Sequence, residues 1–138
     1  MSAQFTTTCR VEFSDTDMAG IVHFTNFYLW MEHAEHAWFR SLGLKIIEEQ
    51  SDGSTISWPR GSCACSFKAP AYYNDVLEVR LTAVRKGEKS LTMQFEFYRD
   101  ETQIAVGELK TVCCRIREEE PLRSIRIPPE YDEKIQEL

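Results

Sequence analysis

One amphipathic segment limits most strongly how this chain of 138 residues can fold. From about Asn26 to Leu42, apolar residues recur at spacings of three and four, which places them on one face of a helix. They are Phe27, Trp30, Met31, Ala34, Trp38 and Leu42. Thr25 or Asn26 can cap the start of this helix, and Gly43 suits the left-handed position that ends one. We therefore expect one long helix with a wide apolar stripe.

The other regular segments are typical of β-strands. Residues 77–81 and 91–97 alternate apolar and polar side chains, as strands do when one face lies on a core. The expected strands are Thr6–Phe13, Ile56–Lys68, Val76–Val84, Leu91–Tyr98 and Gln103–Ile116. Residues 45–55 are expected to form a loop, and Pro129 suits the first position of a short C-terminal helix. The chain therefore predicts a single α+β domain over residues 1–138, with one long helix against a predominantly antiparallel sheet.

Two residues mark irregular points in the expected strands. Pro59 has no N–H to donate to a neighbouring strand, so it predicts an edge position or a bulge. In the last strand the apolar phase slips near Gly107, which predicts a bulge or burial on both faces.

Charge and hydropathy exclude several classes of partner. Sixteen Lys and Arg residues against 22 Asp and Glu residues give a formal charge of −6. Such a chain lacks the broad positive field that binding to a nucleic-acid backbone requires, so we expect no nucleic-acid partner. The longest uncharged apolar stretch, Phe24–Met31, is too short to cross a membrane. Residues 1–10 have no apolar region typical of a secretory signal.

Cysteine usage points to a reducing compartment. The five cysteines are Cys9, Cys63, Cys65, Cys113 and Cys114. Their number is odd and no CxxC spacing occurs, so we expect buried, apolar thiols in a cytoplasmic protein instead of disulfides or a metal site.

The segment most suggestive of chemistry runs from Val11 to Tyr28, VEFSDTDMAGIVHFTNFY. Asp15 and Asp17 follow the first strand, Gly20 turns the chain, and the long helix then begins. A helix N-terminus presents unpaired backbone N–H groups, which can stabilise an oxyanion while a carboxylate attacks or activates water. The alternative is that both aspartates are ordinary turn residues. A calcium loop is disfavoured because the segment lacks the further oxygen ligands at the required spacing.

This segment, with its Asn-Phe-Tyr entry to the helix, resembles the 4-hydroxybenzoyl-CoA thioesterase family. The resemblance extends in the same order through Ser62–Phe67, Asn74–Leu77, Lys89-Ser90 and Ile127–Tyr131. It implies a hot-dog fold, in which an antiparallel sheet wraps around one long central helix. It also implies a homodimer with active sites at the subunit interface, assembling into a homotetramer.

The resemblance assigns roles to the residues of the loop. Asp17 is the expected catalytic carboxylate, and Asp15 is expected to shape the loop. Phe24 is the expected main oxyanion donor, through its backbone N–H, and His23 adjoins the site, where it could orient water or substrate. Met18, His23 and Thr25 depart from the family's pattern, so the resemblance indicates the reaction class and leaves the acyl group open.

Coenzyme A carries phosphates, so its site needs local cations in an acidic chain. Arg85, Lys86 and Lys89 cluster around one expected turn, and Lys89-Ser90 matches the family where a basic run contacts the nucleotide, although Gly87-Glu88 interrupts that run. The alternative is a solvated turn without a ligand. The expected substrate-binding residues are Gly20, Ser62, Arg85, Lys86, Lys89 and Ser90.

No metal or other cofactor is expected. Glu32, His33, Glu35 and His36 superficially suggest metal ligands, but carboxylate-bridged sites in helical bundles draw ligands from several helices and this chain offers one long helix. The function expected is hydrolysis of an acyl-CoA thioester, with Asp17 as nucleophile or as general base. Two alternatives remain: a hot-dog dehydratase or hydratase that pairs His23 with Asp17, and a non-catalytic acyl-CoA-binding protein.

Overall fold

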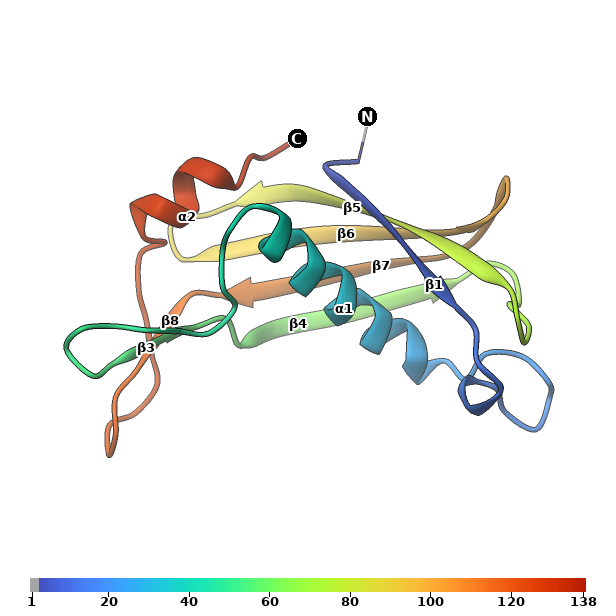
Figure 1. The fold of residues 1–138 in the computed structure, drawn as a ribbon, viewed down its shortest axis with the longest axis horizontal. Helices are drawn as coiled ribbons and strands as arrows, with labels where there is room; N and C mark the ends of the chain where they lie inside the picture. The colour runs from blue at the N-terminus through green and yellow to red at the C-terminus, as the bar shows by residue number, and fades with distance from the viewer. Residues whose placement is uncertain (1–2) are drawn as a thin grey trace.

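A five-stranded antiparallel sheet forms the body of the molecule in the computed structural model, which describes residues 3–138. Its strands, in the order β1-β5-β6-β7-β4, are β1 (Phe5–Arg10), β5 (Val76–Lys86), β6 (Ser90–Arg99), β7 (Thr102–Val112) and β4 (Arg60–Phe67). The long helix α1 (Thr25–Ser41) lies across one face of this sheet (Figure 1). The structure therefore confirms the predicted α+β arrangement, and the helix begins and ends within one residue of the prediction.

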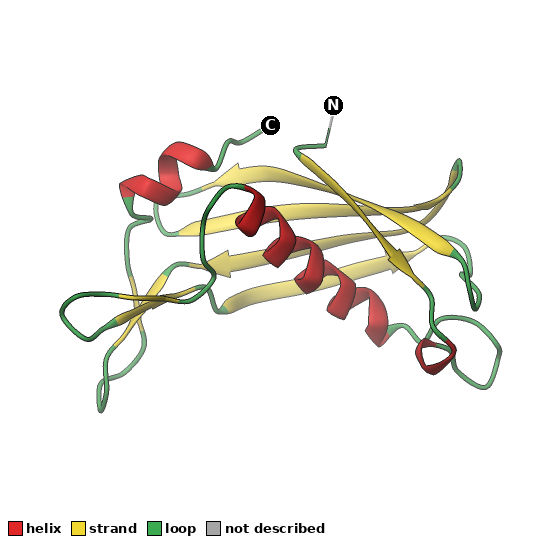
Figure 2. Ribbon diagram, viewed as in Figure 1, coloured by secondary structure: helices red, strands yellow, loops and turns green. Residues whose placement is uncertain are grey.

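A second, small sheet lies at one end of the molecule. Its order is β2 (Glu48–Glu49), β3 (Thr55–Ser57), β8 (Cys114–Ile116) and β9 (Arg123–Ser124). The helix α2 (Pro129–Lys134) lies at the same end, with Pro129 in its first turn as predicted. Figure 2 shows that the loop between β1 and α1, with its short 3-10 helix η1 (Phe13–Asp15), lies at the opposite end.

The core lies between α1 and the inner face of the main sheet. Leu91, Met93, Phe95 and Phe97 of β6 are completely buried, and the ring of Phe27 on α1 packs edge-on against Phe97 with centroids 5.2 Å apart. This is the apolar stripe and the alternating strand that the sequence indicates.

The bulge predicted near Gly107 in the last strand is confirmed, although Gly107 itself has another role. The extra residue in β7 is Ile104, because Phe97 pairs with Ala105 and the next residue, Tyr98, pairs with Gln103. Gly107 instead leaves room for the helix: a Cβ atom at this position would overlap Met31 Sδ and lie 3.0 Å from Met31 Cε.

Several other predictions need correction. The first strand ends at Arg10, and Phe13 is 77% exposed because the chain turns into η1. Residues 45–55, predicted as a loop, contain β2, in which Glu48 pairs with Ile56 of β3. Cys63 is exposed on β4, whereas Cys113 and Cys114 are buried as predicted.

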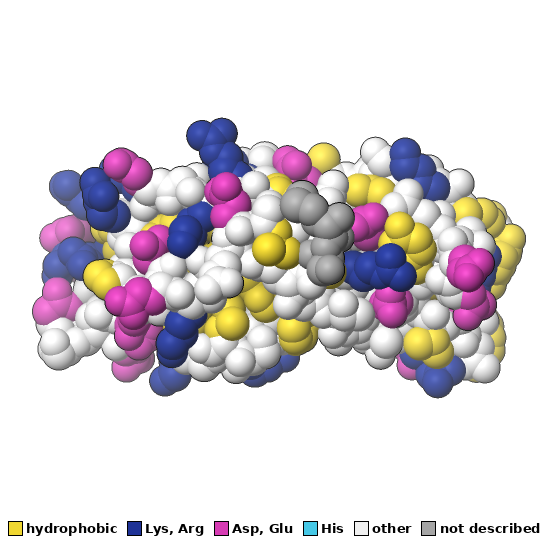
Figure 3. All heavy atoms as spheres, turned by 90° about the horizontal axis from the view of Figure 1, so that it is seen from above, with side chains coloured by type: hydrophobic (Ala, Val, Ile, Leu, Met, Phe, Trp, Pro, Cys, Tyr) yellow, Lys and Arg dark blue, Asp and Glu magenta, His cyan; other side chains and the backbone are white. Residues whose placement is uncertain are grey.

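Pro59 lies between β3 and β4, and β4 is an edge strand with a register shift between Arg60 and Ser62, so the prediction at this proline is confirmed. None of the helices in residues 3–138 is long and apolar enough to cross a membrane. On the face shown in Figure 3, basic and acidic side chains are interspersed, so this face carries no continuous basic surface.

Candidate active site

Hydrogen bonds within the loop between β1 and α1 fix its first turn. The backbone N–H of Glu12 donates to Asp15 Oδ2 at 2.8 Å, and the hydroxyl of Thr16 donates to the carbonyl of Phe13 at 2.7 Å. Such side-chain bonds to nearby backbone stabilise a turn locally. The carboxylate of Asp15 is therefore occupied in shaping the loop, as the sequence predicts.

Asp17 lies two residues further on and is held by hydrogen bonds within its own turn. Its Oδ1 accepts the backbone N–H of Ala19 at 2.8 Å, and its carbonyl accepts the N–H of Gly20 at 2.9 Å. Gly20 has a φ of +81°, a left-handed conformation that glycine adopts without strain. Within residues 3–138, Asp17 Oδ2 has no hydrogen-bond partner.

At the start of α1, one backbone donor has no acceptor in the part of the chain that the structure describes. Phe24 is the N-cap residue, with helical dihedral angles and no side-chain cap, so the predicted caps Thr25 and Asn26 do not act as such. The N–H of Asn26 donates to the carbonyl of His23 at 3.0 Å. The N–H of Phe24 has no acceptor among the described residues. This N–H also lies at the positive end of the helix dipole.

Asn26 connects the helix to the loop, a role that the sequence analysis missed. Its side-chain amide donates to the carbonyl of Asp15 at 2.9 Å, and the backbone N–H of His23 donates to the same oxygen at 2.8 Å. An asparagine at the start of a helix signals a capping residue. Here that side chain reaches back to the loop and holds Asp17 in place relative to Phe24.

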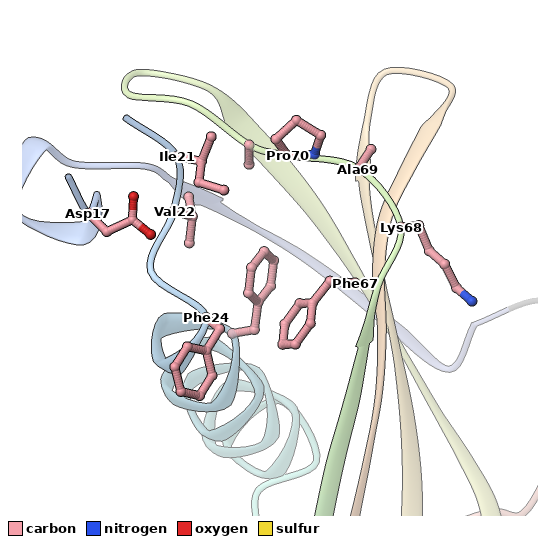
Figure 4. Close-up of a pocket in the computed structure, with 10 residues that line it drawn as sticks. Asp17, Ile21, Val22, Phe24, Phe67, Lys68, Ala69 and Pro70 are labelled. Atoms are coloured by element: carbon pink, nitrogen blue, oxygen red, sulfur yellow. The ribbon is translucent and has the colours of Figure 1, made fainter. Parts of the chain in front are cut away.

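Asp17 and Phe24 line one pocket of about 590 Å³. Its lining residues are Asp17, Ile21, Val22, Phe24, Phe27, Phe67, Lys68, Ala69, Pro70 and Ala71. In Figure 4, Asp17 extends from the loop on one side, Phe24 from the start of α1 below, and Phe67 from the end of β4 on the other side. The pocket thus joins an acidic side chain to the N-terminus of the long helix.

A clamp made by Arg99 holds the far wall of this pocket. Its guanidinium donates to the carbonyl of Pro70 at 3.0 Å and pairs with Asp75 Oδ2 at 2.8 Å. Asp75 Oδ2 also accepts the N–H of Tyr72 at 2.9 Å. Sequence reasoning placed Arg99 only in a hairpin link, because its partners lie some 25 residues away along the chain.

His23 lies beside the pocket. Its ring stacks on Phe24, with centroids 4.9 Å apart, and the backbone N–H of Thr25 donates to its Nδ1 at 3.3 Å. Because Nδ1 accepts a hydrogen bond, the proton of the neutral ring belongs on Nε2. Neither His23 nor Gly20 is among the described residues that line the pocket.

The predicted cations lie far from Asp17 within one chain. Arg85, Lys86 and Lys89 lie at the turn between β5 and β6, at the end of the molecule that carries α2 (Figure 1). Arg85 and Lys86 line a second pocket there, of about 500 Å³, to which Arg126 also contributes. Sequence reasoning missed Arg126, which is remote from the turn along the chain.

Lys86 is occupied by the C-terminal helix. Its ammonium donates to the carbonyls of Asp132 and Ile135, at 2.9 and 2.8 Å, and pairs with Asp132 Oδ1 at 3.2 Å. A cation is stabilising at the carbonyl end of a helix.

Ser62 is exposed on β4, and Ser90 begins β6, so neither serine lines the pocket of Asp17 in this chain.

Two acidic residues of α1, Glu32 and Glu35, pair with Arg60 of the sheet. Glu35 is completely buried and contacts Arg60 of β4 with both oxygens, at 2.7 and 2.8 Å. Burial raises the pKa of Glu35, and the hydrogen bond and charge of Arg60 offset this in part. Residues 3–138 contain no group of three His, Cys, Asp or Glu side chains placed to hold a metal ion.

Known proteins with similar sequences act on CoA thioesters. The model of the Thioesterase-like superfamily matches residues 11–135 of the chain. The 4-hydroxybenzoyl-CoA thioesterase of Pseudomonas sp. is 28% identical over 138 residues, which cover 96% of this chain and 98% of that protein. The 1,4-dihydroxy-2-naphthoyl-CoA hydrolase of Prochlorococcus marinus is 34% identical over 106 residues, which cover 70% of this chain and 66% of that protein.

The comparison with solved structures leads to the same family as the comparison of sequences. A gentisyl-coenzyme A thioesterase superimposes with a TM-score of 0.79 at 28% identity, over 93% of this chain and 99% of that one. The match confirms the hot-dog arrangement that the sequence predicts.

Proposed function

Because the chain belongs to the Thioesterase-like superfamily, we propose that it hydrolyses an acyl-CoA thioester to the free acid and CoA. One observation carries this proposal: Asp17 and Phe24 line the same pocket, and within residues 3–138 neither Asp17 Oδ2 nor the backbone N–H of Phe24 has a hydrogen-bond partner. A thioester carbonyl placed between them would meet a negative oxygen on the carbon side and a hydrogen-bond donor on the oxygen side.

Phe24 acts in this proposal through its backbone. As the carbonyl carbon becomes tetrahedral, negative charge develops on its oxygen, and the N–H of Phe24 at the helix N-terminus stabilises that charge. A single donor of this kind is worth about 2.7–4 kcal/mol in the transition state. The side chain of Phe24 contributes only to the pocket wall.

Asp17 acts in one of two ways. As a nucleophile, Asp17 Oδ2 bonds to the carbonyl carbon, the C–S bond breaks, CoA leaves as a thiolate, and water then hydrolyses the mixed anhydride. As a general base, Asp17 takes a proton from water while the water oxygen attacks the carbonyl carbon; the tetrahedral intermediate then collapses, the C–S bond breaks, and CoA leaves as a thiolate that takes up the proton. In both cases the products are the acid and CoA.

The position of His23 favours hydrolysis over hydration. A hydratase mechanism requires the imidazole to face the substrate together with Asp17. The ring of His23 is stacked on Phe24 and accepts from Thr25, outside the described lining of the pocket. We propose that His23 adjoins the site and packs against Phe24.

We also propose that CoA is bound across two subunits. The cations at the β5–β6 turn lie at the opposite end of the folded molecule from the loop that carries Asp17. The strand β4 has one edge with which no other strand of residues 3–138 pairs. Such an edge is a template for pairing with another chain. A homodimer, assembling into a homotetramer, would bring Arg85 and Lys89 of one subunit toward the pocket of another. Lys86 would support them by holding α2 beside the turn.

Thiol release distinguishes this function from its alternatives. Purified protein is incubated with saturated, aryl, enoyl and 3-hydroxyacyl CoA esters, and free CoA is followed with a thiol reagent alongside enoyl absorbance. Catalytic thiol release from at least one ester supports hydrolysis. A change in enoyl absorbance without thiol release would indicate a hydratase, and saturable binding without either would indicate a binding protein.

The predicted cytoplasmic location accords with five cysteines that are all free.

A further inference from the structure

The wall of the Asp17 pocket is almost entirely apolar. Its described side chains are those of Phe24, Phe27 and Phe67 and of five aliphatic residues or proline, with Asp17 and Lys68 as the polar exceptions. Phe24 and Phe67 remain 55% and 49% exposed. Exposed aromatic side chains around a pocket indicate that an apolar group covers them when the site is filled.

The aromatic wall is held in place by the core. The ring of Phe27 packs edge-on against Trp30 and Phe97, with centroids 5.3 and 5.2 Å apart, and only 4% of the residue is exposed. Phe67 lies against it at 5.4 Å. A ligand that reaches Phe27 therefore meets an apolar surface fixed by the core.

Three backbone N–H groups of the pocket wall already have acceptors within the chain. The backbone N–H of Val22 donates to the carbonyl of Ala71 at 2.9 Å, and those of Lys68 and Ala69 donate to the carbonyl of Ile104 at 2.8 and 3.2 Å. The side chain of Lys68 points away from the pocket (Figure 4). In the proposed reaction, Asp17 and the N–H of Phe24 are both committed to the thioester group.

From this wall we infer that the chain prefers acyl groups without hydroxyl substituents, such as plain aryl or alkyl groups. The inference rests on the proposed function, which places the acyl group in this pocket. A hydroxyl carried into the pocket would lose its hydrogen bonds to water, and apart from Asp17 and Lys68 it would meet only apolar side chains in the described lining. A hydrophobic pocket discriminates against an added hydroxyl by about tenfold to a hundredfold.

The test compares matched pairs of substrates. The kcat/KM values are measured for benzoyl-CoA against 4-hydroxybenzoyl-CoA and for hexanoyl-CoA against 6-hydroxyhexanoyl-CoA. The alkyl pair is needed because a para hydroxyl also donates electron density to the thioester and slows attack on it. We expect the unsubstituted member of each pair to be favoured by about tenfold or more. Equal or faster turnover of the hydroxylated members would overturn the inference.

Two variants test whether the apolar wall causes the preference for esters without a hydroxyl group. Val22→Thr and Ala71→Ser each add a hydroxyl to a buried lining position with little change in shape. At least one of them should lower the preference for the unsubstituted ester several-fold. Val106→Thr is the matched control, because Val106 pairs with Glu96 on the outer face of the sheet and should leave the preference unchanged. An unchanged preference in both pocket variants would contradict the inference.

Binding separates failure of this inference from failure of the proposed function. If no ester released CoA, the hydrolase function would be wrong, and the preference would be decided from the Kd values of the same four esters measured by calorimetry. Tighter binding of both unsubstituted esters would support the apolar pocket. Equal or weaker binding would refute it.

Discussion

The side-chain amide of Asn26 donates to the main-chain carbonyl of Asp15 at 2.9 Å, which joins the first turn of α1 to the loop that carries Asp17. This bond fixes the position of the helix N-terminus relative to Asp17, the catalytic carboxylate of the proposed mechanism. Orientation of this kind accounts for a large part of many rate accelerations, and small displacements are costly.

Replacing Asn26 should therefore lower activity more than its distance from the reaction suggests. In Asn26→Ala the carbonyl of Asp15 keeps its bond from His23 but loses the link to the helix. We expect kcat to fall by about tenfold and the free energy of unfolding by about 1 kcal/mol. Steady-state kinetics and urea unfolding measure both. Full activity in Asn26→Ala would show that this bond does not position Asp17.

Gly107 and Met31 should be energetically coupled. A Cβ atom in Gly107→Ala would overlap Met31 Sδ, so the free energy of unfolding should fall by about 1–3 kcal/mol. In Met31→Ala the helix side chain is shortened, and adding Gly107→Ala to that variant should cost much less. Urea unfolding of the four proteins in this cycle gives the coupling. Additive effects would mean that the contact is not the reason for glycine.

Of the basic residues at the β5–β6 turn, Lys86 should contribute to stability, and Arg85 and Lys89 should contribute to binding of CoA. Lys86→Gln loses the bonds to the last carbonyls of α2, so its melting temperature should fall by about 3 °C, corresponding to about 1 kcal/mol. Arg85→Gln and Lys89→Gln should keep the wild-type melting temperature and raise KM for acyl-CoA several-fold, with a larger effect at low salt. Unchanged KM values in both would remove these residues from the CoA site.

Asp52 should stabilise the protein in a pH-dependent manner. Hydrogen bonds from the side chain and backbone of Ser54, and then Arg117, lower the pKa of Asp52 to about 2 from 3.8. A carboxyl whose pKa is lowered by folding adds stability above its unfolded pKa, and this stability is lost as the pH falls toward about 2. The urea midpoint of Asp52→Asn should thus be lower than that of the wild type at pH 7, with the gap closing below pH 4. A gap that stays constant down to pH 2.5 would argue against this origin.

Periodicity made the long helix and the central strands predictable. The stripe containing Phe27 and Met31 and the alternation around Phe95 each follow from burial on one face, so a single segment contains the necessary information. The motif around Asp17 located the loop for the same reason, because Asp15 and Gly20 form their turns with nearby residues.

Contacts between distant segments were not predictable. Lys86 was expected near a ligand, and only the fold shows that α2 takes up its ammonium. Arg99 likewise clamps the pocket wall through Asp75. A local contact was missed as well: the first strand was expected to continue to Phe13, but it ends at Arg10 and the N–H of Glu12 donates to the side chain of Asp15. In each case a specific side-chain bond outweighs the local pattern.

The central claim is that Asp17 performs the chemistry at the N-terminus of α1. Asp17→Asn keeps the shape of the side chain and removes its charge, and Asp15→Asn in the same loop is the matched control, because its side-chain oxygen can still accept from Glu12. With thiol release measured on the best ester, and with folding checked by circular dichroism, Asp17→Asn should lose at least about 10²-fold in kcat and Asp15→Asn less than about tenfold. Near wild-type kcat in a folded Asp17→Asn protein would contradict the account.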